Sequence, residues 1–422
     1  MVDRPEAVEP DLDQLLTTLA SPGSGGHQRV VDLALQRPER LTDLVVMSAS
    51  VLRTTSSTAI DAALALVPNE SLQAVADAAV ASLRAGSDPR DSQAAQLVAG
   101  LSLQAPRTLR PYLEQLWDLA PNSQTYYACW PWRAASDDEI ERLAARLHPS
   151  SDESERAWQC LLETRTPHGW AVAVAAIGSA IPPGHHADAC LNLVGIEQRT
   201  GEIRRLVAEP TCHIEFPRGF LVPPKWVGVT GLLSYPSWHP GSEVLGTGRF
   251  GGEVDARCAV CCGPLHRLLA FDEAPANIPE GLQVVTCLSC LGWSRPVLFF
   301  AHHGSSVSPA GADLTKQQPE LLGEALPETT VTIRRSPQRW RLQDWASSND
   351  RENLNRVGGE PTWIQSPEFP ACPDCQRTMR FLLQFDSLEI EGGPWWLWGS
   401  GGILYAFWCD GCSLSATLWQ CT

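Results

Sequence analysis

Four short cysteine motifs in the C-terminal half decide how this chain folds. They read Cys258-Ala259-Val260-Cys261, Cys287-Leu288-Ser289-Cys290, Cys372-Pro373-Asp374-Cys375 and Cys409-Asp410-Gly411-Cys412. A Cys-x-x-Cys turn presents two sulfurs to one ion, so two turns complete the four-ligand tetrahedron that Zn²⁺ prefers. Taken in order along the chain, the motifs predict two tetrathiolate zinc sites.

Disulfides and redox chemistry are the competing interpretations of these cysteines. The N-terminus, from Met1 to Glu6, lacks a cationic segment followed by an apolar core, so we expect a cytoplasmic protein with reduced thiols. The longest apolar stretch, Gly169 to Ala180, is too short to cross a bilayer. Thioredoxin-like dithiols use the same Cys-x-x-Cys spacing, but four motifs in two ordered pairs favour metal. We expect the adjacent Cys262 to be either a buried thiol or a thiol just outside the ligand set, rather than a ligand.

Both predicted sites are structural rather than catalytic. A catalytic zinc keeps one position open for water, whereas four thiolates close the coordination sphere. Each ion is therefore expected to contribute about 10–16 kcal/mol to folding. The sequence contains no nucleophile elbow, phosphate-binding loop or metalloprotease helix, and we predict no catalytic residue.

The cysteine motifs belong to an internal duplication. Residues 249–253 (Arg-Phe-Gly-Gly-Glu) correspond to 356–360 (Arg-Val-Gly-Gly-Glu), and 268–272 (Leu-Leu-Ala-Phe-Asp) correspond to 382–386 (Leu-Leu-Gln-Phe-Asp). The second copy is longer between Gly-Gly-Glu and its first motif, where it carries Trp363-Ile364-Gln365. Long loops between paired motifs that hold a β-hairpin are typical of zinc ribbons. We predict a duplicated β-rich zinc-ribbon module.

The N-terminal half has a different character. Short apolar periods of three and four residues, separated by Pro or Gly, predict helices up to about Leu206. Two interpretations remain open: a HEAT-like helical repeat array and an irregular helical bundle. The predicted fold is α+β and multidomain, with a helical domain at 1–206, β modules at 207–303 and 331–422, and a linker or long loop at 304–330.

Charge narrows the class of partner. The formal net charge of the 422 residues is −16, and no basic patch stands out, which argues against nucleic-acid binding. An acidic surface favours a basic protein partner by steering association. Lys225 and Lys316 are the only lysines, a bias typical of a GC-rich bacterial genome.

Aromatic residues crowd the second copy, and their role is open. Trp395 and Trp396 follow Gly392-Gly393-Pro394, which places them on a loop. Large side chains can cover a thin sheet as core, or they can line a groove for a partner, because Trp and Tyr dominate binding hot spots.

The second copy resembles the bacterial YwqG-like family. The resemblance rests on residues 358–365 (Gly-Gly-Glu-Pro-Thr-Trp-Ile-Gln), Cys372-Pro373-x-Cys375, residues 379–386 and Gly402-x-Leu404-Tyr405-x-Phe407. Similar elements occur in the eukaryotic programmed cell death protein 2 group. The first copy departs from the pattern, since Val254 replaces the Pro and Ala270 stands in place of the Gln.

This resemblance implies binding rather than catalysis. The eukaryotic relatives are ribosomal-protein chaperones, and bacterial relatives are proposed immunity proteins against toxins. By analogy the resemblance points to Trp363, Gln365, Gln384 and Phe385 for partner contact, to which the exposed-loop argument adds Trp395 and Trp396. The predicted function is therefore a zinc-binding protein-interaction factor. The alternatives are an enzyme acting on a peptide or protein between the helical and β modules, and a zinc-ribbon nucleic-acid binder.

Overall fold

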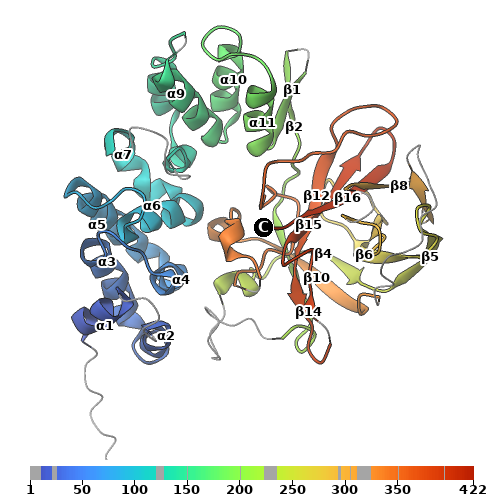
Figure 1. Cartoon of the computed structure of the whole chain (residues 1–422), viewed down its shortest axis with the longest axis horizontal. Coiled ribbons are helices and arrows are strands. Elements are labelled where there is room, and N and C mark those ends of the chain that lie inside the picture. The colour runs from blue at the N-terminus through green and yellow to red at the C-terminus, as the bar shows by residue number, and fades with distance from the viewer. Residues whose placement is uncertain are drawn as a thin grey trace, which may run out of the picture. The chain divides into compact units, whose positions relative to one another are not determined.

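A computed structural model describes most of the chain (Figure 1). The described residues are 11–20, 26–119, 128–149, 151–199, 201–222, 235–292, 296–304, 306–310, 325–349, 351–393 and 395–422. Helices occupy the N-terminal part and strands the C-terminal part, so the α+β prediction is confirmed. Within the described residues, no helix combines the length and apolar composition required to cross a membrane.

Eleven α-helices lie among the described residues before residue 194. They are α1 Leu12–Leu19, α2 Gly26–Gln36, α3 Leu41–Val51, α4 Thr58–Leu66, α5 Leu72–Arg84, α6 Gln93–Gln104, α7 Leu113–Leu119, α8 Asp137–Ala144, α9 Asp152–Glu163, α10 Pro167–Ala176 and α11 His185–Leu193.

Local sequence explains where these helices begin and how they pack. The Asp11 carboxylate accepts the first free amides of α1, and Ser136 with Glu139 forms a capping box at the start of α8. A Cβ at Gly100 in α6 would lie 2.7 Å from Leu64 Cδ2 in α4, so the glycine permits these two helices to pack closely.

The helical pattern ends earlier than we predicted. Helix α11 stops at Leu193, and strands β1 (Ile196–Arg199) and β2 (Glu202–Arg205) form an antiparallel hairpin. Residues 196–205 contain only two large apolar side chains, Ile196 and Ile203, so neither a helical nor a strand period is visible there. Glu197 faces Arg204 across the hairpin and accepts a hydrogen bond from its Nε at 2.5 Å.

The remaining strands form the β part of the fold. They are β3 Cys212–Glu215, β4 Val244–Phe250, β5 Glu253–Arg257, β6 Pro264–Glu273, β7 Gln283–Thr286, β8 Leu298–His303, β9 Ser306–Ala310, β10 Thr329–Arg335, β11 Arg356–Val357, β12 Arg380–Asp386, β13 Leu388–Glu389, β14 Trp395–Trp396, β15 Ile403–Cys409 and β16 Leu414–Gln420.

Twelve of these strands join in one antiparallel sheet that spans both copies. Its order is β5-β6-β4-β10-β3-β11-β12-β15-β16-β8-β9, with β7 paired to β6, while β13 and β14 form a separate pair.

Part of the predicted linker, 311–324, lies outside the described residues, whereas 306–310 forms β9. The chain divides into two compact units, one from Met1 to Arg146 with 159–164 and 225–235, the other holding 147–158, 165–224 and 236–422. The predicted domain boundaries stay predictions.

The two copies exchange strands at the middle of the sheet. Strand β3 precedes the first copy in the chain but pairs with β11 of the second, and β10 precedes the second copy but pairs with β4 of the first. Strands β3 and β10 also pair with each other, with Ile214 opposite Ile333. Neither copy can therefore complete its part of the sheet alone.

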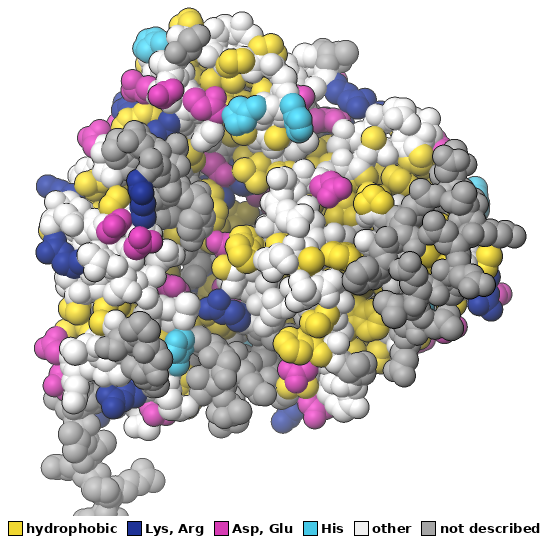
Figure 2. Space-filling view, in the orientation of Figure 1, with side chains coloured by type: hydrophobic (Ala, Val, Ile, Leu, Met, Phe, Trp, Pro, Cys, Tyr) yellow, Lys and Arg dark blue, Asp and Glu magenta, His cyan; other side chains and the backbone are white. Residues whose placement is uncertain are grey.

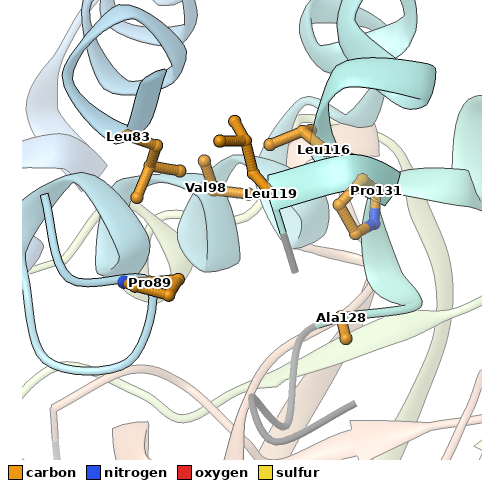
Figure 3. Close-up of a pocket in the computed structure, with 7 residues that line it drawn as sticks. All are labelled: Leu83, Pro89, Val98, Leu116, Leu119, Ala128 and Pro131. Carbon is orange, nitrogen blue, oxygen red and sulfur yellow. The ribbon is translucent and has the colours of Figure 1, made fainter. Parts of the chain in front are cut away.

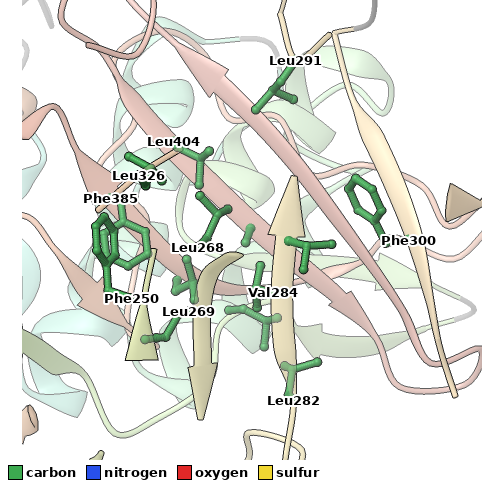
Figure 4. Close-up of a cluster of buried hydrophobic side chains, with 14 of the residues drawn as sticks. Phe250, Leu268, Leu269, Leu282, Val284, Leu291, Phe300, Leu326, Phe385 and Leu404 are labelled. Carbon is green, nitrogen blue, oxygen red and sulfur yellow. The ribbon is translucent and has the colours of Figure 1, made fainter. Parts of the chain in front are cut away.

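Apolar side chains from both copies fill one core (Figure 4). Phe250 from β4 and Phe385 from β12 are fully buried, and their ring centroids lie 5.2 Å apart. Leu268 and Leu269 of β6 join the same cluster as Leu404 of β15. Burial of this apolar surface stabilises the interleaved sheet.

A Gly-Gly turn follows β4 in the first copy and β11 in the second. Gly251 has φ +77°, and a Cβ there would overlap the Pro327 carbonyl, while Gly252 donates its N–H to Leu326 O at 2.7 Å. Gly359 likewise donates to Ala208 O at 2.7 Å in the second copy. The repeated glycines therefore form tight turns with positive φ.

This packing yields a matched pair of substitutions. Gly251→Ala and Gly281→Ala both place a side chain at positive φ, but nothing lies within 4 Å of a Cβ at Gly281. We expect Gly281→Ala to cost about 1 kcal/mol and Gly251→Ala more than about 2 kcal/mol, because only the latter also meets a backbone carbonyl. Near-ultraviolet circular dichroism during urea unfolding measures both midpoints. Equal shifts for the two variants would contradict the close contact.

Candidate metal centres

The first cysteine tetrad forms at one end of β6. Cys258 and Cys261 lie in the turn between β5 and β6, and Cys287 directly follows β7, three residues before Cys290 in the same turn. Strand β6 pairs with β5 on one side and β7 on the other, with His266 opposite both Glu253 and Thr286. The ladder thus brings together cysteines that are separated by 26 to 32 residues.

The second tetrad is built in the same way on β12 and β15. Cys372 and Cys375 precede β12, and Cys409 ends β15 in the turn to β16 that carries Cys412. Arg380 lies opposite Trp408 in the β12–β15 ladder, which sets the two motifs side by side.

Sulfur spacing fits a tetrahedral metal site in both tetrads. All four Sγ atoms of each group lie within 4.8 Å of one another. Measured separations are 3.9 Å for Cys258–Cys290, 3.6 Å for Cys261–Cys287 and 3.6 Å for Cys375–Cys409. Four sulfurs at about 2.3 Å from one Zn²⁺ lie about 3.8 Å apart, whereas a disulfide needs about 2.05 Å. Two groups of four cysteines are therefore positioned to bind two metal ions.

The first turn of each tetrad has the same backbone conformation. Cys258 N donates to Gly263 O at 2.9 Å, and Cys372 N donates to Arg377 O at 2.8 Å. The residue after the second cysteine has positive φ in both turns, +59° at Cys262 and +58° at Gln376. Cys262 is exposed, so of our two alternatives for it the buried thiol was wrong.

Backbone amides also face the sulfurs of the first tetrad. Val260 N lies 3.4 Å from Cys258 Sγ, and Gly263 N lies 3.4 Å from Cys261 Sγ. Such donors stabilise negative charge on sulfur, as a thiolate site requires.

Protons are distributed unequally within the first tetrad. A hydrogen bond from Cys287 lowers the pKa of the Cys258 thiol to about 5, and the same interaction raises the pKa of Cys287 well above its ordinary value. Burial raises the pKa of Cys290 to about 12. Cys258 therefore loses its proton more readily than Cys287 and Cys290 do.

The second tetrad shows the same asymmetry with a different cause. The Arg377 guanidinium, whose Nε lies 3.5 Å from Cys375 Sγ, lowers the pKa of Cys375 to about 6. Hydrogen bonding to Cys375 raises the pKa of Cys412 to about 12, and burial raises the pKa of Cys409.

Arginines around the second tetrad were missed by sequence reasoning. Arg380 makes a forked hydrogen bond to Asp410 within the last motif, with Nε–Oδ2 at 2.9 Å. Arg199 Nη2 donates to Gln376 O at 3.1 Å, and Arg204 donates to Thr378 O, so the β1–β2 hairpin contacts the first turn of this tetrad. The basic residues beside the motif, Arg377 and Arg380, were the available signal.

Three of the residues predicted for partner contact are buried. Gln384 is fully buried, accepts from Thr362 N at 2.9 Å and donates to Leu354 O at 2.8 Å. Phe385 packs against Phe250, and Trp363 lies 4.7 Å from the Tyr405 ring between centroids. These side chains serve the core of the β part.

The other three predicted contact residues reach the surface to different degrees. Gln365 is exposed, although its Nε2 donates to Cys421 O at 2.6 Å. Trp395 is 56% exposed on β14, whereas Trp396 is half-buried and packs against Trp398. The aromatic cluster thus combines a buried part with an exposed edge.

A buried polar chain lies next to the Gly-Gly turn of the second copy. Ser336 Oγ lies 3.0 Å from His213 Nδ1, His213 Nε2 lies 3.3 Å from Gln343 Oε1, and Gln343 donates to Glu352 at 2.5 Å. Burial lowers the pKa of His213 to about 3 and raises the pKa of Glu352, so both groups tend toward their neutral forms. Each of the four residues is at most 8% exposed, so their hydrogen bonds form a structural network rather than a reaction site.

A shallow hollow in the helical part has no chemical groups to offer. Its lining, as far as the described residues show it, consists of apolar side chains (Figure 3). The lining residues are Leu83, Pro89, Val98, Leu116, Leu119, Ala128 and Pro131. Acid–base and metal chemistry both need polar groups that this lining lacks.

Comparison with known proteins gives one partial relative. The chain is 28% identical over 183 residues to "Uncharacterized protein YpfL" of Salmonella typhimurium, a match that covers 40% of this chain and 40% of that protein. The chain thus spans about 40% of the length of this curated relative, whose printed name assigns no activity. No family model matches the chain, and no solved structure matches it.

The tetrads predict the result of single cysteine substitutions. Cys258→Ser is expected to lower the metal content by one ion per chain and to destabilise the β part, because three sulfurs leave the tetrahedron incomplete. Cys262→Ser, four residues away but facing solvent, is the matched control and should retain two ions. Inductively coupled plasma mass spectrometry on both purified proteins measures the content. Loss of metal from Cys262→Ser alone would contradict the assigned ligand set.

Proton competition predicts a steep pH dependence of metal affinity. At pH 7 Cys287 and Cys290 in the first tetrad hold protons that metal binding must displace, and Cys409 and Cys412 do so in the second. Releasing at least these two protons per ion lowers the apparent association constant by at least about a hundredfold for each unit of falling pH. Competition titrations with a metal-binding dye between about pH 6 and 8 measure the slope. A pH-independent constant would show that the thiols are already ionised.

Proposed function

We propose that this chain is a non-enzymatic, zinc-binding protein-interaction factor whose partner is a basic protein. The observation that carries the proposal is the pair of cysteine tetrads, each with four sulfurs within 4.8 Å of one another. Four thiolates leave no coordination position for substrate, so these sites hold structure together.

Zinc is the metal that the donor set favours. Four soft sulfur ligands at tetrahedral spacing suit Zn²⁺, which carries no redox chemistry of its own. When bound, the ion would cross-link two turns that come from distant parts of the chain. Cys258, Cys261, Cys287 and Cys290 would hold one ion, and Cys372, Cys375, Cys409 and Cys412 the other. Thiolates of this kind persist in the reducing cytoplasm, which is the compartment we propose.

We further propose the finer architecture as zinc ribbons preceded by a HEAT-like helical array. Paired Cys-x-x-Cys turns on antiparallel strands support the ribbons. Short consecutive helices that bury one apolar stripe, as α5 does with Leu72, Val75 and Ala79, support the array. Both features are typical of proteins that bind other proteins.

Membership of the YwqG-like family is part of the proposal. Its support is the motif set of the second copy, from Gly358 to Phe407. A role as an immunity protein or a chaperone-like factor follows from that resemblance, by analogy alone.

Charge and an exposed aromatic edge support a basic partner. The net charge is −16, and on the face in Figure 2 Lys and Arg side chains lie scattered among Asp and Glu. On the β14 edge, Trp395 is 56% exposed and the following Leu397 is 41% exposed, with Glu389 opposite Trp395 in the β13–β14 pair. An arginine or lysine of a partner can stack on the indole while it faces the carboxylate.

The test uses the immobilised full chain to capture partners from native lysate of the source organism. We expect a basic protein whose association rate falls steeply between about 50 and 500 mM salt, because steering by net charge is screened. A salt-independent rate for the purified complex would overturn the basic-partner proposal. A shift of RNA or DNA by the purified chain at low salt would favour nucleic-acid binding instead.

Matched surface variants locate the contact. Leu397→Ala and Leu193→Ala remove side chains of similar exposure, 41% and 47%, and only the first lies beside Trp395. Trp395→Ala and Leu397→Ala should weaken the captured complex by about ten- to a hundredfold, and Leu193→Ala should not. Surface plasmon resonance with the captured protein measures all three. Equal affinity for Trp395→Ala and the unsubstituted chain would remove β14 from the interface.

A further inference from the structure

The two cysteine tetrads differ in burial although their geometry is the same. All four cysteines of the first tetrad are buried, with exposures of 1–8%. In the second, Cys372 and Cys409 are buried, whereas Cys375 and Cys412 are partly exposed. Two of its four sulfur ligands can therefore be approached from solvent.

The residues between the cysteines are also more buried in the first tetrad than in the second. The first tetrad encloses Val260, which is 5% exposed, and Leu288, and both pack with the core that joins the two copies. At the second tetrad the corresponding turns carry Asp374, Asp410 and Gly411, all exposed. Apolar turns anchor the first tetrad within the sheet core, while polar turns place the second at the surface.

The Arg377 side chain contacts the second tetrad from the solvent side. Arg377 is exposed, and its Nε lies 3.5 Å from Cys375 Sγ. A Cβ at Gly411 would overlap the Arg377 guanidinium, so this glycine leaves room for the arginine against the last turn. Displacement of Arg377 would uncover the Cys375 sulfur, whereas access to the first tetrad requires opening of the core.

From these differences we propose that the second tetrad is an exchangeable metal site and the first a permanent one. A competing thiol or amino-carboxylate ligand would attack from the side of Cys375 and Cys412, and these two sulfurs would leave the coordination sphere first. Cys372 and Cys409 would be the last to release. The inference rests on the zinc binding proposed above and assigns a different exchange rate to each copy.

The functional consequence lies in the β15–β16 hairpin. The Cys409–Cys412 turn connects these two strands, and β16 also pairs with β8 of the first copy. Exchange at the second tetrad would therefore act on the turn between two central strands, while the first tetrad keeps β5, β6 and β7 in place. Such an arrangement makes the second copy responsive to available zinc or to another thiol-rich protein.

The test follows zinc release from the purified full chain loaded with two ions. With excess 4-(2-pyridylazo)resorcinol as the probe, we expect two phases of one equivalent each, the fast one at least about tenfold faster. Cys412→Ser should remove the fast phase, and Arg377→Gln should accelerate it. Arg257→Gln, an exposed arginine directly before Cys258, is the matched control and should change neither phase.

Mass-spectrometric mapping after brief N-ethylmaleimide treatment keeps the test valid if a variant fails to fold. During the fast phase Cys375 and Cys412 should become alkylated while the four cysteines of the first tetrad stay protected. One common rate for both ions, or a fast phase that belongs to the first tetrad, would overturn the inference. A chain that holds no zinc at the outset would instead overturn the proposed zinc function, so the two failures are distinguishable.

Discussion

Tetrahedral sulfur geometry is the constraint to which the β part of this fold conforms. Two turns, each with two sulfurs, must meet to within 4.8 Å, and the chain between them must return on itself to allow this. The antiparallel ladders supply that return: β6 lies between β5 and β7 at the first tetrad, and β12 lies beside β15 at the second. Because sulfur spacing depends on strand register, any slip of one residue in these ladders would separate the ligands.

The exchange of strands between copies makes the two tetrads parts of one structure. Strand β3 pairs with the second copy and β10 with the first, so the sheet is continuous from β5 to β9. A core shared by Phe250 and Phe385 lies across the junction. The two similar segments therefore form a single interleaved unit, in which each stabilises the other through backbone hydrogen bonds as well as apolar contact.

The sequence predicted which cysteines lie together better than it predicted their surroundings. Motif spacing determined which cysteines meet, because a metal requires four and the chain offers them in ordered pairs. Strand exchange could not be predicted, since β3 and β10 lack the repeated motifs and their partners are set by long-range pairing. The β1–β2 hairpin was missed for a local reason: four-residue strands carry too short a period to outweigh a helical neighbourhood. The exposure of Cys262 depends on one positive φ angle, which cannot be predicted from its residue type.

One difference between the copies shows how a buried polar residue and its partner must occur together. Gln384 in β12 is fully buried and is satisfied by Thr362 N and Leu354 O. Thr362 belongs to the longer segment between Gly-Gly-Glu and the cysteine motif, which the first copy lacks. A glutamine at the equivalent position of the first copy would therefore lack the hydrogen bond that Thr362 N supplies in the second copy. An unsatisfied amide in the core costs several kcal/mol. Ala270 stands there, 5% exposed, and leaves no polar group to satisfy. The longer segment and the buried glutamine of the second copy therefore form one structural unit, because the segment supplies the Thr362 amide that the Gln384 side chain accepts from.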